Sequence, residues 1–206
     1  MFRRGKIVAT IVLLAAAAMA AAPRRVVSLG PSLTETVFAL GCGDRVVGVG
    51  DYAQWPPEVR TLPRLGGLYN PSLERLLALD PDLVLLPSPI PRLEAACRRA
   101  GIPVAVVPVT SLDGVVEATE RVAALLGCPE RGRTLVARIR GELEAVRHRV
   151  ATRPRRRVLL QVGTAPGPGL EGLTVAGGGT FLSGLVATAG GANVFADPHQ
   201  RYFRPS

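Results

Sequence analysis

The sequence predicts an α/β fold of two parallel-sheet lobes joined by a single long helix, with the second lobe truncated. Strand and helix patterns alternate along most of the chain, which is typical of a parallel sheet covered by helices on both faces. One uninterrupted helical pattern then separates this alternation from a shorter one that ends at Ser206. The predicted segments are a signal peptide at 1–22, a first lobe at 23–128, a bridging helix at 129–154 and a partial second lobe at 155–206.

The N-terminal segment has the pattern of a cleaved secretory signal peptide. Arg3, Arg4 and Lys6 precede an apolar run from 7 to 18, and small residues follow it. This run is shorter than the ~20 apolar residues that a membrane-spanning helix needs. We therefore expect a chain that is exported to the periplasm, with an uncleaved membrane anchor as the alternative.

Each element of the first lobe has its own sequence signal. Short runs rich in valine and leucine predict strands, and apolar residues at helical spacing between them predict helices. Ser32 and Glu35 have the spacing of a capping box, and Gly41 ends the helix that they begin. The predicted strands are 24–29, 45–49, 82–86 and 103–107, and the predicted helices begin near 32, 71, 91 and 115.

The bridging helix is predicted by an apolar residue at every third or fourth position, with arginines around the rest of the helix. A helix from 130 to 152 would be about 33 Å long, which is longer than a crossover in a small sheet requires. A long surface helix within a single domain is the alternative. The apolar positions are Leu135, Ile139, Leu143, Val146 and Val150.

The second lobe is predicted to repeat the α/β pattern over fewer residues. A strand at 156–162 is followed by a loop rich in glycine and proline at 163–179 and by a helix over about 180–189. The remaining residues up to Ser206 are too few to build a lobe as large as the first. We therefore expect the second lobe to be incomplete.

Composition and charge argue against a nucleic-acid-binding protein. The formal charge of +9 falls to +6 without the three basic residues of the predicted signal peptide, which is a moderate excess. The basic run at 153–157 has no interleaved aromatic residues, so a solvated helix end and loop is the favoured interpretation. No nucleic-acid partner is expected.

Motifs for catalysis, metal binding and nucleotide binding are missing from the sequence. His148 lies on the predicted bridging helix and His199 lies near the end of the chain, so a histidine-based triad or a multi-histidine metal site lacks its parts. The glycine patterns of dinucleotide and nucleotide sites do not occur. We expect no cofactor, no metal and no enzymatic activity.

The three cysteines, Cys42, Cys97 and Cys128, each fall in or beside a predicted helix. Small buried residues are the favoured interpretation, because the number is odd and the spacings are wide. One disulfide bond is the alternative in an oxidising compartment.

A long segment without a helix or strand pattern follows the second predicted strand, at 50–70. Loops longer than ~12–15 residues are usually functional or disordered. This segment holds Tyr52, Trp55 and Tyr69, which are two of the three tyrosines and the only tryptophan. Because ligands bind beyond the carboxyl ends of parallel strands, Tyr52 and Tyr69 are predicted to contact a ligand. For Trp55, packing of the loop onto its own lobe is an equal alternative.

The helix after this loop places an acidic residue near its start. Asn70 is a suitable N-cap, Pro71 a suitable first residue, and leucines at 73, 76 and 77 predict a buried stripe. Glu74 points away from this stripe and is therefore predicted to be exposed. A carboxylate in the first turn gains about 0.3–1 kcal/mol from the helix dipole. Helix stability alone explains Glu74, and contact with a basic partner is the functional alternative.

Four stretches of the chain resemble the substrate-binding proteins of ABC importers for cobalamin, haem and iron-siderophores. The resemblance covers essentially everything after the signal peptide, in the order of the family. It implies two lobes on one rigid helix, a ligand between the lobes and delivery to a membrane permease. The stretches are "RRVVSLGPSLTETVFALG", "VVGVGDYAQWPPEV", "LGGLYNPSLERLLALDPDLVLL" and "LVATAGGANVFAD".

The resemblance gives Glu74 a role, because the family places a glutamate at this helix start and docks it onto permease arginines. The equivalent glutamate of the second lobe follows a serine that Ser206 resembles, so the chain is expected to end before it. The family normally acts as monomers. An ABC permease in the inner membrane is thus the expected macromolecular partner.

The resemblance also ranks the ligands. Haem-binding members tend to have Gly-Tyr-x-Arg just before this helix, whereas the corresponding stretch here, Gly66-Gly67-Leu68-Tyr69, has no arginine, which argues against haem. The segment from Tyr52 to Pro57 is similar to that of cobalamin-binding members, and Tyr202 matches their aromatic residue on the second lobe. A corrinoid is the first expectation and a ferric siderophore the second. The predicted ligand-binding residues are Ser32, Tyr52, Trp55, Tyr69 and Tyr202.

A hypothesis of a different class is an exported α/β hydrolase that uses Ser28 or Ser32 as its nucleophile. The chain has no G-x-S-x-G motif, which most such enzymes place at a sharp strand-to-helix turn. The binding protein is therefore the favoured hypothesis.

Overall fold

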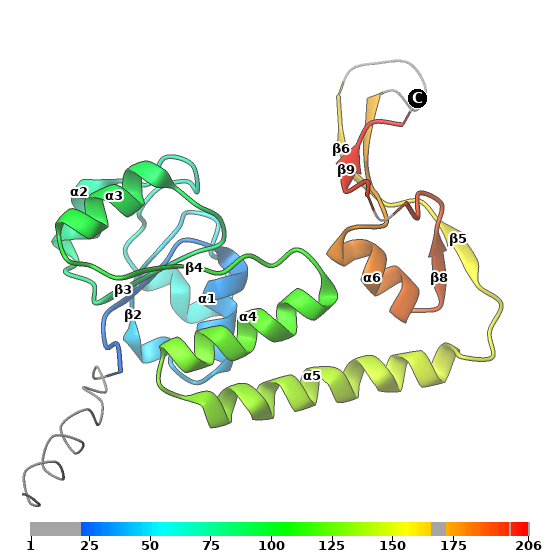
Figure 1. The fold of residues 1–206 in the computed structure, drawn as a ribbon, viewed down its shortest axis with the longest axis horizontal. Helices are drawn as coiled ribbons and strands as arrows, with labels where there is room; N and C mark the ends of the chain where they lie inside the picture. The colour runs from blue at the N-terminus through cyan, green and yellow to red at the C-terminus, as the bar shows by residue number, and fades with distance from the viewer. Residues whose placement is uncertain (1–21, 166–171, 198, 206) are drawn as a thin grey trace, which may run out of the picture.

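The computed structural model describes residues 22–165, 172–197 and 199–205. The predicted signal peptide lies outside these residues, apart from Ala22. In the described part of the chain, no helix is both long enough and apolar enough to cross a bilayer. Two α/β lobes are joined by one long helix, α5, which confirms the predicted fold class (Figure 1).

The first lobe, β1 to α4, is built on a parallel sheet with the strand order β2-β1-β3-β4. Every residue of β1 and β3, the two central strands, is buried. Strands buried on both faces are near-continuous apolar runs, which is why these strands could be predicted from composition. The strands are β1 (Val26–Ser28), β2 (Val46–Val49), β3 (Leu83–Leu86) and β4 (Val104–Val106).

Helices cover both faces of this sheet. On one face, α1 and α4 pack with the first part of α5 around a cluster that includes Val37, Val122 and Leu135. On the other face, α2 and α3 pack through Leu76 and Leu93. The helices are α1 (Pro31–Ala39), α2 (Leu73–Ala78), α3 (Pro91–Arg99) and α4 (Leu112–Leu125), with 3-10 turns η1 (Gly43–Arg45) and η2 (Pro57–Thr61).

Two predicted helix starts were wrong in detail. The N-cap of α1 is Gly30, which has no side chain to cap the helix, and Ser32 lies inside the helix, so Ser32 and Glu35 do not form a capping box. The N-cap of α2 is Ser72, whose Oγ accepts from the backbone N–H of Arg75 at 3.3 Å. Residues 66–71 instead form a turn before the helix. This turn is closed by the backbone N–H of Ser72, which donates to the carbonyl of Leu65 at 2.7 Å. Pro71 is therefore outside the helix.

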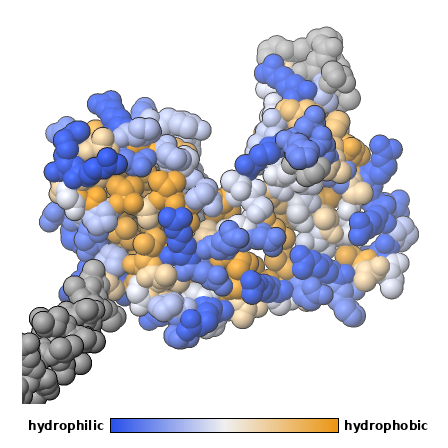
Figure 2. Space-filling view, in the orientation of Figure 1, coloured by the Kyte–Doolittle hydropathy of each residue, from blue (hydrophilic) through white to orange (hydrophobic). Residues whose placement is uncertain are grey.

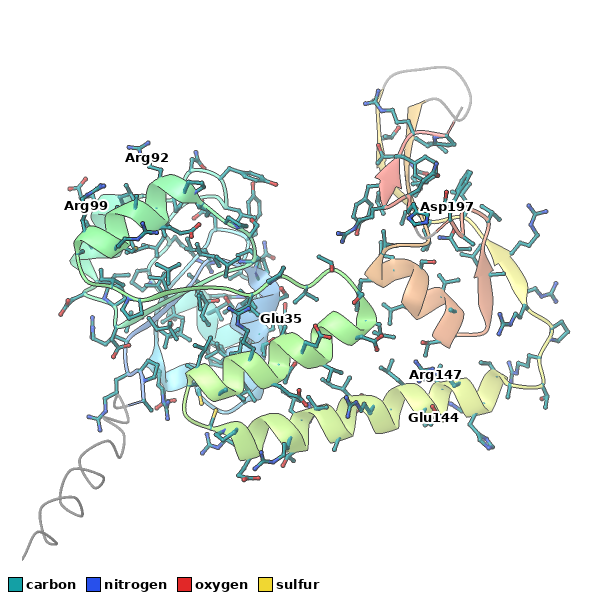
Figure 3. All side chains as sticks on the ribbon, viewed as in Figure 1. Glu35, Arg92, Arg99, Glu144, Arg147 and Asp197 are labelled. Atoms are coloured by element: carbon teal, nitrogen blue, oxygen red, sulfur yellow. The ribbon has the colours of Figure 1, made fainter. Side chains whose placement is uncertain are left out.

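The bridging helix α5 (Pro129–Val150) packs against α4 along its first half. A Cβ added at Gly132 would lie 2.5 Å from the Cβ of Ala123, so the close approach of the two helices depends on this glycine. Beyond Leu135 and Val136, the predicted apolar positions are half-buried and most of the remaining residues are exposed. Glu144 and Arg147 pair on this outer part of the helix, at 3.3 Å (Figure 3).

The second lobe, β5 to β9, contains two small sheets. The parallel arrangement that we predicted holds only for β5 and β8, because β6, β7 and β9 form an antiparallel sheet. The single strand predicted at 156–162 is divided between these sheets as β5 and β6. The elements are β5 (Arg156–Val158), β6 (Gln161–Thr164), β7 (Leu173–Ala176), α6 (Phe181–Thr188), β8 (Gly191–Asn193) and β9 (Tyr202–Phe203).

Candidate functional site

The loop that follows β2 is held in place by its own hydrogen bonds. The guanidinium of Arg64 donates to the carbonyls of Gly50 at 3.1 Å and Val59 at 3.2 Å, and also to that of Ala53. The carboxylate of Asp51 accepts from the N–H of Gly66 at 3.0 Å. These contacts fold the segment from 50 to 72 into an ordered loop on the first lobe.

Aliphatic residues, rather than aromatic rings, anchor this loop to the core. Ala53, Val59 and Leu65 are buried. In contrast, Tyr52 is 70% exposed and Tyr69 is 90% exposed. An exposed ring on an ordered loop costs hydrophobic free energy, and contact with a ligand is one way to recover it.

Trp55 is 61% exposed. The alternative in which this ring packs the loop onto its own lobe is thus not what the structure shows. With Tyr52 and Tyr69, Trp55 forms the aromatic loop, a name used below for these three rings. All of them follow the carboxyl end of β2, the position at which open parallel sheets bind ligands.

The predicted aromatic ligand contact of the second lobe, Tyr202, lies in β9. Tyr202 is 53% exposed, whereas the neighbouring Phe203 packs edge to face against Phe195, with ring centroids 5.3 Å apart. Arg201, the residue before β9, donates to the carbonyl of Thr110 at 3.4 Å. Thr110 follows β4, so this bond joins the carboxyl side of the first sheet to the strand that holds Tyr202.

The molecular surface is hollowed between the two lobes (Figure 2). The helix α5 runs along the opposite side of the molecule, and β9 lies on the side of the second lobe that is nearer to the first (Figure 1). The loops after the parallel strands and β9 can therefore contribute to the walls of one space. That the aromatic loop and Tyr202 bind a single ligand stays a prediction.

Ser32 lies in the first turn of α1 and is exposed. Gly30, the N-cap of α1, lies close to Pro87, since a Cβ added at Gly30 would be 3.0 Å from the Cγ of that proline. Pro87 directly follows β3. Ser32 is thus near the carboxyl edge of the sheet, as a ligand contact requires, and its role in binding stays a prediction.

Glu74 is exposed in the first turn of α2, as predicted from its place one residue after Leu73. The predicted buried stripe is narrower than expected, since Leu76 is buried but Leu77 is exposed. An exposed leucine beside an exposed carboxylate leaves this face of α2 open to a partner. Permease docking by Glu74 remains a prediction.

Arg64 is the residue that sequence reasoning missed. It is a lone arginine between Pro63 and Leu65, and its spacing gives no signal. Its function depends on three carbonyl groups spread over residues 50 to 59, which converge only when the loop is folded. The loop also holds Arg60, so the sequence gives no sign of which arginine will have this role.

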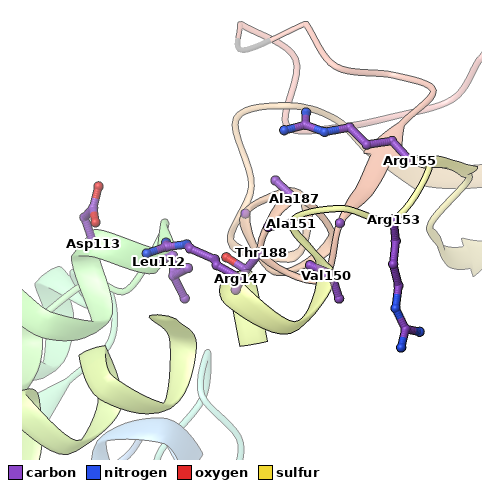
Figure 4. Close-up of a pocket in the computed structure, with 11 residues that line it drawn as sticks. Leu112, Asp113, Arg147, Val150, Ala151, Arg153, Arg155, Ala187 and Thr188 are labelled. Carbon is purple, nitrogen blue, oxygen red and sulfur yellow. The ribbon is translucent and has the colours of Figure 1, made fainter. Parts of the chain in front are cut away.

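A separate cavity of about 520 Å³ lies where α4, α5 and α6 meet (Figure 4). Arg147, Arg153 and Arg155 contribute to its lining, and Arg147 extends towards Asp113 of α4 (Figure 4). None of the predicted ligand-binding residues lines it. The cavity is thus a gap at the joint between the lobes rather than part of the aromatic site.

Ser28, His148 and His199, which were considered for catalysis or metal binding, lie in three different parts of the fold. Ser28 is fully buried, and its Oγ lies 2.9 Å from the hydroxyl of Thr34. His148 and His199 are both exposed. Across 22–165, 172–197 and 199–205, no three histidine, cysteine or acidic side chains are grouped so that they could hold a metal ion.

Comparison with known families gives a match over nearly the whole described chain. The family described as "Periplasmic binding protein" matches residues 26–206. A vitamin B12-binding protein of Yersinia pseudotuberculosis is 33% identical over 200 residues, which are 94% of this chain and 67% of that relative. Both the family and this relative are named as binding proteins.

Solved structures show the same fold. The periplasmic haem-binding protein RhuT from Roseiflexus sp. RS-1, in its apo form, has a TM-score of 0.76 at 36% identity, over 89% of this chain and 70% of that one. The periplasmic vitamin B12-binding protein BtuF of Vibrio cholerae has a TM-score of 0.71 at 28% identity, over 89% and 71%. The chain thus spans about 70% of the length of these structures.

Proposed function

Because the chain belongs to the periplasmic binding protein family, we propose that it captures a corrinoid between its lobes and delivers it to the permease of an ABC importer. It acts in the periplasm as a monomer, after export by its N-terminal signal peptide. The observation that carries this proposal is the set of exposed aromatic rings on both lobes, at Tyr52, Trp55, Tyr69 and Tyr202.

The ring set suits a large, partly apolar ligand. Ligand sites bury most of the ligand surface against apolar and aromatic side chains, with few polar groups to orient it. Arg64 and Asp51 tie the aromatic loop to itself through hydrogen bonds within the first lobe. A pre-ordered loop lowers the entropic cost of binding, which favours tight capture from dilute solution.

Haem is the second candidate, and a specific observation favours it. The haem-binding RhuT structure is 36% identical to this chain, which is more than the 28% of the BtuF structure. The phenol of Tyr69 is accessible to an iron atom. The stretch from Gly66 to Tyr69, however, has no arginine, whereas haem-binding members tend to have Gly-Tyr-x-Arg before this helix. A ferric siderophore is the remaining candidate within the family.

Titration of the purified protein with cyanocobalamin, haemin and a ferric siderophore tests the proposal. Trp55 is the only tryptophan, so its fluorescence reports directly on the aromatic loop. We expect saturable quenching at an equimolar ratio with cyanocobalamin. Saturation by haemin alone, with a charge-transfer absorbance that Tyr69→Phe abolishes, would establish haem instead. No response to any of the three would reject the aromatic loop as a binding site.

We also propose that Glu74 contacts the permease. Glu74→Gln removes the charge from an exposed position and leaves the hydrogen bond of the Ser72 cap in place. Ligand affinity should stay unchanged while uptake into reconstituted vesicles that contain the cognate permease falls several-fold. Glu58→Gln, which changes an exposed carboxylate in η2 of the same lobe, is the matched control. Equal uptake by both variants would remove Glu74 from the interface.

A further inference from the structure

The sulfur atoms of Cys42 and Cys128 lie 3.5 Å apart beside the start of the bridging helix. Cys42 precedes η1, in the turn after α1, and Cys128 directly precedes α5. Both side chains pack in the same apolar cluster. Since the sulfur atoms of a disulfide are ~2.05 Å apart, an approach of about 1.5 Å would bring this pair to bonding distance.

Cys97 is excluded from such a pair by its place in the fold. It is buried on α3, in the cluster on the opposite face of the parallel sheet. A bond from Cys97 to either of the other cysteines would have to pass through the sheet. The fold thus places two of the three cysteines side by side and isolates the third.

We propose that Cys42 and Cys128 form a disulfide bond in the periplasm, while Cys97 remains a thiol. The oxidant is a disulfide of the thiol–disulfide exchange class. The thiolate of Cys128 attacks it and releases one thiolate, and the thiolate of Cys42 then attacks the Cys128 sulfur and releases the other. Two electrons pass to the oxidant, and the two cysteine protons end on its two thiols. The proposal needs an oxidising compartment but is independent of the ligand.

Cys128 is the thiol that reacts first with the oxidant, because it is partly exposed, whereas Cys42 is buried. A groove lined by Gly41 and Arg131 lies next to the pair, and a guanidinium nitrogen of Arg131 is 3.9 Å from the Cys42 sulfur. Burial, followed by the contact with Cys42, raises the pKa of the Cys128 thiol to about 11, although the charges of Arg131 and Arg45 act in the opposite direction. Exchange should therefore accelerate as the pH rises.

The disulfide bond would join the start of α5 covalently to the first lobe. Hydrogen bonds already connect the two parts at this place. Arg131 donates to the carbonyls of Leu40 at 3.3 Å and Gly41 at 2.9 Å. In return, Arg45 donates to the carbonyl of Leu126 at 2.8 Å. With the disulfide in place, α5 would move as part of the first lobe. Any movement between the lobes would then occur at the other end of α5, after Val150.

The test uses the purified chain, fully reduced and then incubated with oxidised glutathione. Free thiols are blocked with a maleimide after unfolding, and peptides are identified by mass spectrometry. We expect a linked pair containing Cys42 and Cys128, about 2 Da lighter than the sum of its reduced peptides, and a label on Cys97 alone. The oxidised protein should melt about 5–10 °C above the reduced one.

Cys97→Ser is the matched control and should keep both the linked pair and the shift in melting temperature. Cys42→Ser and Cys128→Ser should abolish both. A maleimide label on all three cysteines after excess oxidant, or a link that includes Cys97, would overturn the proposal. If a serine variant fails to fold, the oxidised and reduced forms of the unmodified sequence decide the question alone.

Discussion

The two lobes differ in how much apolar surface they bury. In the first lobe, β1 and β3 are buried throughout, and helices cover both faces of the sheet. In the second lobe, β5 and β6 are mostly exposed, and Val175 and Ala176 are the fully buried apolar residues among those that the structure describes there. The stability of the described chain should therefore reside in the first lobe, and the second lobe should depend on its contacts with α4 and α5.

The largest expected effect is a loss of stability on truncating a leucine of the first lobe, compared with the same change in the second lobe. Leu85→Ala, in the centre of β3, removes a fully buried side chain and should lower the free energy of unfolding by about 2–5 kcal/mol. Leu159→Ala, between β5 and β6, alters a side chain that is 41% exposed and should cost less than about 0.5 kcal/mol. Urea denaturation followed by circular dichroism measures both. Equal losses would mean that the second lobe has a core of its own.

Arg64→Ala tests whether the aromatic loop is ordered from within the first lobe. The substitution leaves the carbonyls of Gly50, Ala53 and Val59 without their donor, and hydrogen bonds to a charged group contribute about 1.5–3 kcal/mol. We expect a matching loss of stability and faster proteolysis between 50 and 72. Arg60→Ala, at an exposed position of the same loop, should change neither.

Tyrosine substitutions test whether both lobes contact the ligand. Tyr69→Ala and Tyr202→Ala should each weaken the binding of the ligand found by titration about tenfold, which corresponds to about 1.4 kcal/mol. Tyr69→Phe and Tyr202→Phe keep the rings and are the controls for stacking. An effect of Tyr69→Ala without one of Tyr202→Ala would restrict the site to the first lobe.

The smallest effect concerns the pH dependence of the reduced protein. Because burial raises the pKa of the Cys128 thiol to about 11, the protonated form is the one that the fold favours. This contribution to stability is complete below the unfolded-state pKa of ~8.5 and is lost as the pH rises towards the folded value. At pH 8, alkylation of Cys128 by iodoacetamide should be at least about tenfold slower in the folded chain than in urea. Equal rates would show that the thiol is not protected.

The sequence was most informative where burial is uniform. The apolar runs of β1 to β4 predicted these strands to within about two residues, since a strand covered on both faces must be apolar along its whole length. The second lobe was less predictable. Its stretch from 156 to 162 changes sheets after Val158, and nothing in the local pattern shows which strand will be the partner.

Chain order and periodicity alone determined the α/β class, the long bridging helix and the presence of rings in the loop after β2. Only the tertiary structure decided that Arg64 orders that loop, that the rings are exposed and that Cys42 lies beside Cys128. The physical reason is that periodicity is a local property of the chain. Contacts between residues far apart in sequence exist only once the whole lobe has packed.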